Sequence, residues 1–403
     1  MKYIVILGDG MADHPVPQLN NKTPLQCAVK PNIDFLSKHG EVGLVKTIPD
    51  GIPPGSDAAN LSVMGYNPKQ YYTGRSPIEA VSMGIDLSPS DLTFRCNLVT
   101  LSEHEQDYKN KIMIDYSSDE ISTAEAEELI DAVNSHFKTD IISFYPGISY
   151  RHCVVWKNGP DGFSCTPPHD ILEKRITDYL PCGEHGKILL DMMMQSYSIL
   201  KDHAVNKSRI SRGLRPANSI WLWGEGRKPA LAKFSEKYNL KGSVISAVDL
   251  IKGIGICAGL RTVDVEGATG NIHTNFLGKA QAALNELNDG QDFVYVHIEA
   301  PDECGHRFEI ENKVKSIEII DELVVGTILK GLEKYEDYRL LVLPDHPTPL
   351  MLRTHTSEPV PFVLYQKGKP KVSGVDGYDE FQAKKTGLFI EEGYTLMDYL
   401  LKG

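Results

Sequence analysis

The sequence predicts an α/β fold in which helices cover both faces of a mostly parallel sheet, with a smaller α+β domain inserted. Short β-rich apolar runs alternate with helical patterns in the first and last parts of the chain, which is typical of such a sheet. The pattern changes at about residue 86, where strands and a polar excursion follow one another. The length of 403 residues allows two or three domains at roughly 100–200 residues each.

The N-terminal part begins with a short apolar run, residues 3–7, that predicts a strand. A helix is predicted over 24–39 and a second strand over 42–48. A loop rich in proline and glycine, 49–55, then leads to a stretch from Ser56 that can open a helix.

The middle of the chain predicts a compact α+β segment. A strand is expected over 92–100, a hairpin-like excursion over 102–111, an acidic helix over 122–138 and a strand over 150–156. We therefore expect residues 86–178 to form an inserted domain.

After residue 188 helices and strands alternate again. Predicted strands cover 220–223, 242–245, 293–298 and 339–343, and predicted helices cover 229–238, 247–258, 274–288 and 310–334. The economical interpretation is one discontinuous core, residues 1–85 and 179–403, interrupted by the inserted domain.

Bulk composition limits the classes of partner. The formal net charge of −12 and the pI of about 5.6 argue against a nucleic-acid binder that depends on phosphate neutralisation. No apolar stretch is long enough to cross a bilayer, and the start enters a strand too soon for a signal peptide. The seven dispersed cysteines contain no C-x-x-C pair, so a reduced, cytoplasmic protein is expected. The oligomeric state is not specified by the sequence.

Polar side chains gather where predicted strands end, which is where binding crevices of open α/β sheets lie. Six of them are good ligands for divalent metals and one is a possible nucleophile. These residues are Asp9, Ser56, Asp302, His306, Asp345, His346 and His355.

Each of these residues also has an ordinary structural interpretation. Asp9 is followed by glycine, as in many turns. Asp302 and His306 can share one face of a helical turn, but they also fit a surface turn with a capping aspartate. A lone histidine such as His355 is mostly structural, and Ser56 precedes a helical stretch as an N-cap would.

Taken together, the residues predict a two-metal site of the kind that stabilises the attacking and leaving oxygens of an in-line displacement. Mixed aspartate and histidine ligands suit manganese or zinc better than calcium. A serine at a helix N-terminus lies where an anion such as a phosphoryl group is favoured. Walker A, G-x-S-x-G and G-x-G-x-x-G signatures do not occur.

Several segments carry a resemblance to a known family. They are Ile6-Leu-Gly-Asp-Gly-Met-Ala-Asp13, Pro54-Gly-Ser-Asp-Ala-Ala-Asn60, Tyr72-Thr-Gly-Arg-Ser-Pro-Ile-Glu79, Gly267-Ala-Thr-Gly-Asn271, Pro301-Asp-Glu-Cys-Gly-His306 and Pro344-Asp-His346 with His355. In these segments the chain resembles the archaeal-type, cofactor-independent phosphoglycerate mutases of the alkaline phosphatase superfamily. The resemblance covers nearly the whole chain and implies an alkaline-phosphatase-like core with an inserted cap.

The resemblance also implies a mechanism. Asp302, His306 and His355 would hold one divalent ion, and Asp9, Ser56, Asp345 and His346 the other. Manganese is the expected metal, with magnesium or zinc as alternatives. Ser56 would take the phosphoryl group from 3-phosphoglycerate and return it to the 2-hydroxyl, while the cap keeps water out.

The expected partner is a small phosphorylated carboxylate, for which cations and imidazoles are needed. Each candidate also fits an ordinary surface or structural role. The candidates are Arg75, Arg151, His152, His169, Arg212, Arg215 and Lys252.

One position departs from the family. Trp223 stands in Trp-Leu-Trp-Gly-Glu-Gly where the mutases are expected to carry arginine. A bacterial branch with such a segment has been proposed to act as a homoserine kinase, so a phosphotransferase acting on an amino alcohol is the alternative hypothesis. A simple hydrolase fits less well because the cap would exclude water, and a vestigial binding protein fits poorly because no expected ligand is missing.

Overall fold

The computed structural model describes residues 1–402. The chain divides into two compact units: residues 1–72 join with the chain from Ala230 onward, and Thr73–Pro229 form the second unit. No helix within residues 1–402 has the length and apolar character needed to cross a membrane.

The first unit is built on a sheet of eight strands. Their bounds are β1 (Lys2–Gly8), β2 (Glu41–Val45), β8 (Gly242–Ile245), β9 (Arg261–Val263), β10 (Phe293–Ile298), β11 (Tyr338–Leu343), β12 (Val360–Gln366) and β13 (Phe389–Ile390). The strand order is β13-β2-β12-β11-β1-β10-β8-β9. Only β12 runs antiparallel to both of its neighbours among these described strands. The mostly parallel sheet confirms the predicted fold class.

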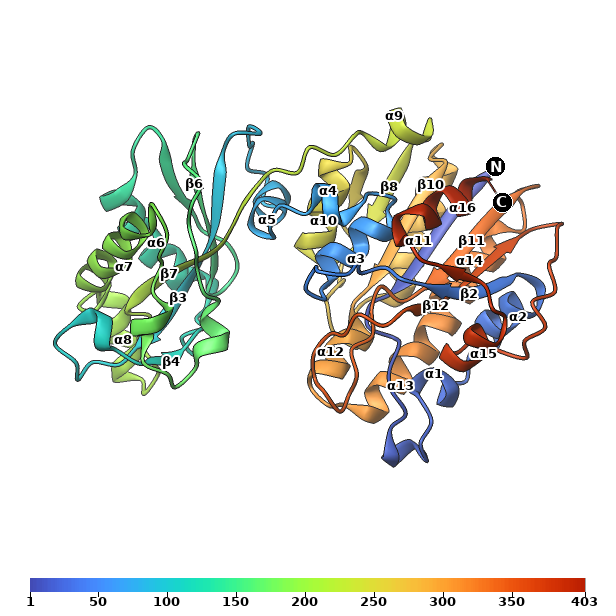
Figure 1. Cartoon of the computed structure of the whole chain (residues 1–403), viewed down its shortest axis with the longest axis horizontal. Helices are drawn as coiled ribbons and strands as arrows, with labels where there is room; N and C mark the ends of the chain where they lie inside the picture. Colours follow the sequence, from blue (N-terminus) through green and yellow to red (C-terminus); the bar gives the residue numbers. More distant parts are fainter. Residues whose placement is uncertain (403) are drawn as a thin grey trace. The chain divides into compact units, whose positions relative to one another are not determined.

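Helices lie on both faces of this sheet (Figure 1). They are α1 (Pro24–Cys27), α2 (Pro31–His39), α3 (Ser56–Val63), α4 (Pro68–Tyr71), α9 (Phe234–Tyr238), α10 (Asp249–Cys257), α11 (Phe276–Asn288), α12 (Ala300–His306), α13 (Ile310–Ile319), α14 (Gly326–Leu332), α15 (Glu380–Lys385) and α16 (Leu396–Lys402), with the shorter turns η1 (Pro17–Leu19), η5 (Ile320–Val325) and η6 (Gly393–Thr395). Alternate residues of the central strands, such as Ile4 and Ile6, join the core beneath α11 and α14.

Two predicted helices are interrupted, each for a local reason. The helix expected over 24–39 is split because Pro31 begins α2, and the residue before a proline is disfavoured in helical conformation. The helix expected over 310–334 contains a π-helical turn, η5. The carboxylate of Asp321 in that turn accepts from the backbone N–H of Ile33 at 2.7 Å, so the wide turn supports the start of α2.

The second unit is an antiparallel sheet with helices. Its strands are β3 (Leu92–Leu101), β4 (Met113–Asp115), β5 (Ile142–Tyr145), β6 (Arg151–Trp156) and β7 (Ser219–Arg227), and its helices are α5 (Ser76–Ser82), α6 (Thr123–Phe137), α7 (Gly186–Leu200) and α8 (Ala204–Ser211), with the turns η2 (Tyr108–Asn110), η3 (Pro168–Ile171) and η4 (Ile176–Tyr179). The long strand β3 lies between β6 and β7. Aromatic and aliphatic side chains from the sheet, α6 and α7 form its core.

This unit extends beyond residues 86–178 at both ends. Strand β7, expected to belong to the core, pairs along most of its length with β3, and α7 packs against β7. Helix α5 packs on β3 and β7, which brings residues 73–85 into the same unit. The functional division into a metal-binding core and a substrate-binding cap stays a prediction.

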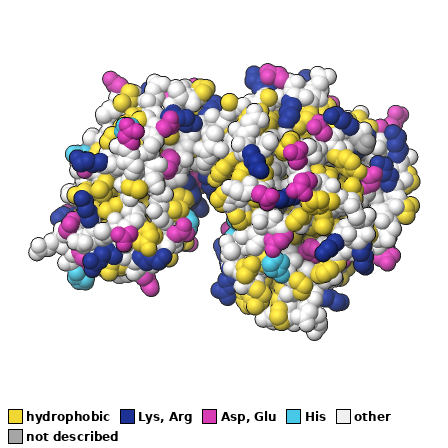
Figure 2. Space-filling view, viewed as in Figure 1, with side chains coloured by type: hydrophobic (Ala, Val, Ile, Leu, Met, Phe, Trp, Pro, Cys, Tyr) yellow, Lys and Arg dark blue, Asp and Glu magenta, His cyan; other side chains and the backbone are white. Residues whose placement is uncertain are grey.

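Charged side chains of both signs are interspersed over the face shown in Figure 2. All seven cysteines lie within residues 1–402 and are free thiols.

Candidate metal centre

Three adjacent strands deliver the predicted ligands to one edge of the first sheet. Strand β1 lies between β10 and β11 and is parallel to both (Figure 1). Because parallel strands end at the same edge, the residues that follow them meet there. Asp9 follows β1, α12 with Asp302 follows β10, and Asp345 follows β11.

A first group combines Asp302, His306 and His355. The Nε2 atoms of both histidines lie 3.3 Å from the Asp302 carboxylate and 2.9 Å from each other. Asp302 and His306 are four residues apart on α12, which places them on one face as expected. His306 donates from Nδ1 to the carbonyl of Arg353 at 3.0 Å, so in the neutral imidazole the lone pair of Nε2 faces the group.

A second group combines Asp9, Asp345 and His346, all of which are buried. His346 Nε2 lies 3.5 Å from Asp9 Oδ1 and 3.4 Å from Asp345 Oδ2. His346 also has a ligand atom within 4.8 Å of those of Asp302 and His355. The two groups are therefore contiguous through His346.

The serine hydroxyl is next to the second group. Ser56 Oγ lies 3.1 Å from His346 Nε2. The N-cap interpretation of Ser56 is wrong, because Gly55 is the N-cap and Ser56 is the first residue of α3, with no side-chain capping bond. The hydroxyl thus stands at a helix N-terminus, where the partial positive charge of the backbone favours an anion.

Burial and neighbouring charges shift the pKa values of several groups at this edge. Burial, followed by the charges of Asp345 and Asp302, raises the pKa of Asp9 well above its ordinary value. Although burial opposes ionisation of Asp302, hydrogen bonds from His306 and His355 hold its pKa well below the usual range. The Asp302 carboxylate in turn raises the pKa of His306 to about 9. Several buried carboxylates around shared imidazoles are a setting that a cation stabilises.

Residues that the sequence did not single out orient the ligands. His297 in β10 contacts Asp9 Oδ2 through Nε2 at 2.9 Å, and burial lowers its pKa to about 3, so the imidazole is neutral. Asn60 donates to Asp345 Oδ2 at 2.9 Å, and Thr348 donates to Asp302 Oδ1 at 2.5 Å. Such contacts from neighbouring side chains fix ligand geometry in metal sites.

The surroundings of Asp9 Oδ1 indicate whether a cation fits this site. Asp9 Oδ1 is fully buried and accepts no hydrogen bond from any residue in 1–402, which is a costly state for a carboxylate oxygen unless it has another partner. It faces His346 Nε2, in a set of oxygen and imidazole donors that suits a first-row divalent cation. The residues therefore fit a divalent metal ion.

The seven predicted substrate-binding residues divide into two sets. Arg212 is paired with Glu125, Arg215 with Asp115 and Asp119, and Lys252 with Asp264 at 2.5 Å. These three cations are exposed or half-buried members of local ion pairs. The other four are Arg75, Arg151, His152 and His169, which lie in the second unit together with Arg212 and Arg215.

Two arginines in that unit converge on one carboxylate, and one of them was missed. Arg75 Nε lies 2.6 Å from Glu79 Oε1, and Arg95 Nε lies 3.0 Å from Glu79 Oε2. Although burial opposes ionisation of Glu79, Arg95, Arg75 and Arg151 hold its pKa below the ordinary value. Arg95 was missed because it lies inside the apolar strand β3, where no loop or motif marks it.

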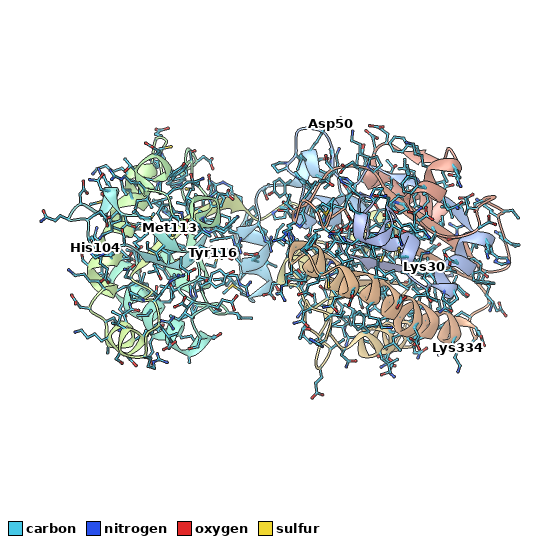
Figure 3. All side chains as sticks on the ribbon, turned by 90° about the horizontal axis from the view of Figure 1, so that it is seen from below. Lys30, Asp50, His104, Met113, Tyr116 and Lys334 are labelled. Atoms are coloured by element: carbon cyan, nitrogen blue, oxygen red, sulfur yellow. The ribbon has the colours of Figure 1, made fainter. Side chains whose placement is uncertain are left out.

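His152 and His169 differ in their surroundings. His152 is buried and accepts from the N–H of Gly147 through Nδ1 at 3.0 Å, and burial lowers its pKa to about 3. The proton of this neutral ring is therefore on Nε2, which has no hydrogen-bond partner within residues 1–402. The His169 ring contacts Tyr116 and Trp223 edge to face. Figure 3 labels Tyr116, and on the opposite side of the same unit it labels His104.

The chain is similar to proteins of one known family. The family model of the 2,3-bisphosphoglycerate-independent phosphoglycerate mutases matches residues 37–206. A Geobacter sulfurreducens protein named "Probable 2,3-bisphosphoglycerate-independent phosphoglycerate mutase" is 52% identical over 100% of both chains. A Methanothrix thermoacetophila protein, named as 2,3-bisphosphoglycerate-independent phosphoglycerate mutase, is 49% identical over 100% of both chains.

Two solved structures are similar over the whole chain. The PH0037 protein from Pyrococcus horikoshii gives a TM-score of 0.83 at 28% identity and covers 100% of this chain and 96% of its own. The cofactor-independent phosphoglycerate mutase from Thermoplasma acidophilum gives a TM-score of 0.65 at 28% identity, with 100% and 99% covered. From these relatives, matched over its full length, we conclude that the chain belongs to the 2,3-bisphosphoglycerate-independent phosphoglycerate mutase family.

Proposed function

We propose that this protein interconverts 3-phosphoglycerate and 2-phosphoglycerate without added bisphosphoglycerate, through a phosphoserine at Ser56. The observation that carries the proposal is the Ser56 hydroxyl, 3.1 Å from His346 Nε2, at a helix N-terminus beside two contiguous groups of metal-ligand atoms. Full-length relatives with this activity in their names support it.

Two divalent ions, manganese in our proposal, are assigned to these groups. Asp302, His306 and His355 would hold one ion, and Asp9, Asp345 and His346, with Ser56, the other. Bound ions would neutralise charge on the phosphoryl oxygens and make the serine hydroxyl easier to deprotonate.

The residues of the chain supply the positioning. Ser56 Oγ gives up its proton as it bonds to phosphorus, and the 3-oxygen of the substrate leaves and takes up a proton. In the return step the 2-hydroxyl loses its proton and bonds to phosphorus, while Ser56 Oγ is protonated again. Asn60 links the serine to a predicted metal ligand, since its Nδ2 donates to the Ser56 carbonyl and to Asp345 Oδ2, each at 2.9 Å.

Substrate recognition is assigned to the second unit. Arg75, Arg151 and the Nε2–H of His152 offer donors for the oxygens of a small phosphorylated carboxylate, and His169 lies by Trp223. The ion pairs of Arg212, Arg215 and Lys252 do not favour a role in substrate binding, so this role stays a prediction for these three residues. We also propose a cytoplasmic location, where this glycolytic substrate is found.

The homoserine kinase alternative was motivated by Trp223 in place of an arginine. The guanidinium carbon of Arg95 lies 4.4 Å from the centre of the Trp223 ring. This part of the unit is therefore cationic despite the tryptophan, and an anionic substrate is favoured over an amino alcohol.

An enolase-coupled assay with manganese-loaded protein tests the proposal. We expect turnover of 3-phosphoglycerate without bisphosphoglycerate, and its loss in Ser56→Ala, because this variant lacks the proposed nucleophile. The exposed serine of Ser211→Ala provides a matched control that should retain activity. Turnover by Ser56→Ala would exclude the phosphoserine mechanism. ATP-dependent phosphorylation of homoserine with no mutase activity would exclude the proposed reaction.

A further inference from the structure

Arg95 is held from two sides in the second unit. Its Nε faces the Glu79 carboxylate at 3.0 Å, and Glu79 is itself shared with Arg75. Its guanidinium carbon lies 4.4 Å from the centre of the Trp223 ring, because Arg95 and Trp223 are cross-strand partners on β3 and β7. An arginine stacked on an aromatic face and anchored through Nε has a fixed guanidinium plane.

The tryptophan platform is itself fixed. Trp223 Nε1 donates to Asn97 Oδ1 at 2.9 Å, and Asn97 donates to the carbonyl of Tyr116 at 3.1 Å. The His169 ring packs edge to face against the indole at 5.3 Å. The indole therefore cannot turn away from Arg95 without breaking these contacts.

The Nε side of the Arg95 guanidinium faces Glu79, and its other edge is formed by the two Nη nitrogens. Neither nitrogen has a hydrogen-bond acceptor within residues 1–402, and the side chain is 13% exposed. Two other arginines of this unit behave differently, since Arg209 and Arg227 each bond through Nε, Nη1 and Nη2. A mostly buried guanidinium with an open pair of parallel N–H donors is suited to an oxyanion.

The local charge also favours an anion. Three guanidiniums, those of Arg75, Arg95 and Arg151, act on the single carboxylate of Glu79, so the surroundings of this carboxylate are cationic. An additional oxyanion would bring this group closer to neutrality.

We propose that Arg95 binds an oxyanion of the phosphoglycerate through its Nη edge, and that Glu79 and Trp223 are positioning residues that set the plane of this edge. The inference rests on the proposed function for the identity of the ligand. Carboxylate and phosphate share the required chemistry, and both are present in the substrate. Trp223 thus acts as a platform for a cation supplied by the neighbouring strand.

Tryptophan fluorescence tests the binding role directly, because the indole of Trp223 touches Arg95. We titrate the manganese-loaded enzyme with D-glycerate, which offers only the carboxylate, and with glycerol 3-phosphate, which offers only the phosphate. A saturable change is expected with at least one of them, and its loss in Trp223→Phe would assign the signal to this indole. The responding ligand identifies the oxyanion.

The signal and the kinetics should respond together to the arginine. In Arg95→Gln we expect the fluorescence change to vanish and KM for 3-phosphoglycerate to rise about 10- to 150-fold, the range for a lost charge-assisted hydrogen bond. Arg95→Lys should restore part of the affinity, and the exposed Arg175→Gln in the same unit should match wild type. An unchanged KM and an unchanged fluorescence titration in Arg95→Gln would overturn the assignment.

Positioning is tested separately from folding. Trp223→Leu and Glu79→Gln should raise KM more than they lower kcat, whereas Trp223→Phe should keep KM within about threefold because a ring remains. If Trp223→Leu and Glu79→Gln lower the Tm but keep the wild-type KM, Trp223 and Glu79 have only a structural role. If wild type fails to turn over phosphoglycerate yet shows the Arg95-dependent fluorescence change, the proposed reaction fails and the oxyanion site stands.

Discussion

Lys313 ties together the two loops that carry ligands of the second metal group. Its side chain and that of Asp13 are both 0% exposed, with Lys313 Nζ 2.7 Å from Asp13 Oδ2. Nζ also donates to the carbonyl of Thr348 at 2.7 Å. Asp13 follows β1 by five residues and Thr348 follows β11 by five, so one ammonium group links the loops that bear Asp9 and His346.

Replacing Lys313 with methionine should destabilise the first unit by about 3–5 kcal/mol, because the buried Asp13 carboxylate loses its counter-charge. Asp13 keeps its contacts with the N–H of Leu350, so adding Asp13→Asn should recover part of the loss. Lys315→Met on the same helix is the matched control. Its ion pair with Glu318 is exposed, and such pairs contribute about 0–1 kcal/mol.

Calorimetry and fluorescence separate the two units in this experiment. All three tryptophans, Trp156, Trp221 and Trp223, belong to the second unit, so their fluorescence should follow its unfolding. We expect Lys313→Met to lower a calorimetric transition while the fluorescence transition stays in place, and to weaken Mn²⁺ binding measured by titration. A loss below about 1 kcal/mol, or equal losses in the single and double variants, would refute the argument from an uncompensated buried charge.

Two further outcomes concern protons and metal. Burial raises the pKa of Glu380 from 4.5 to about 7. A raised carboxyl pKa favours folding while both states are protonated, so stability is lost as pH rises from about 4.5 to 7. Glu380→Gln should flatten this part of the curve in calorimetric Tm measured against pH, and an unchanged slope would contradict it. Mn²⁺ should raise the Tm of wild type and of the exposed control Asp289→Asn by the same amount, and should raise that of Asp345→Asn less, because this variant alters the second group and leaves the first intact. An equal rise in Asp345→Asn would exclude the assignment.

Much of the first unit follows from local patterns, because β1, β8, β10 and β11 are mostly buried strands that are rich in apolar residues. The domain boundary could not be found in the same way. The run in β7 has the character of any buried strand, and only its pairing with β3, more than 100 positions away, assigns it to the second unit.

The same distinction applies to the site. Asp9, Asp302 and Asp345 stand out because they come soon after apolar strands. Asn60 and Thr348 have no such marker, since their function comes from a contact with a carboxylate remote in sequence. Arg95 looks like an interruption of a strand until Glu79 and Trp223 are seen beside it.

The place of β1 in its sheet has a consequence during protein synthesis. Tyr3 pairs with Phe293, 290 positions later, and the other neighbour, β11, is translated later still. At about 5–20 residues per second, the first strand waits roughly 15–60 s for a partner, while Thr73–Pro229 can fold as soon as it emerges. We therefore expect the nascent β1 segment to stay unpaired, and so exposed to aggregation, for most of the synthesis of this chain.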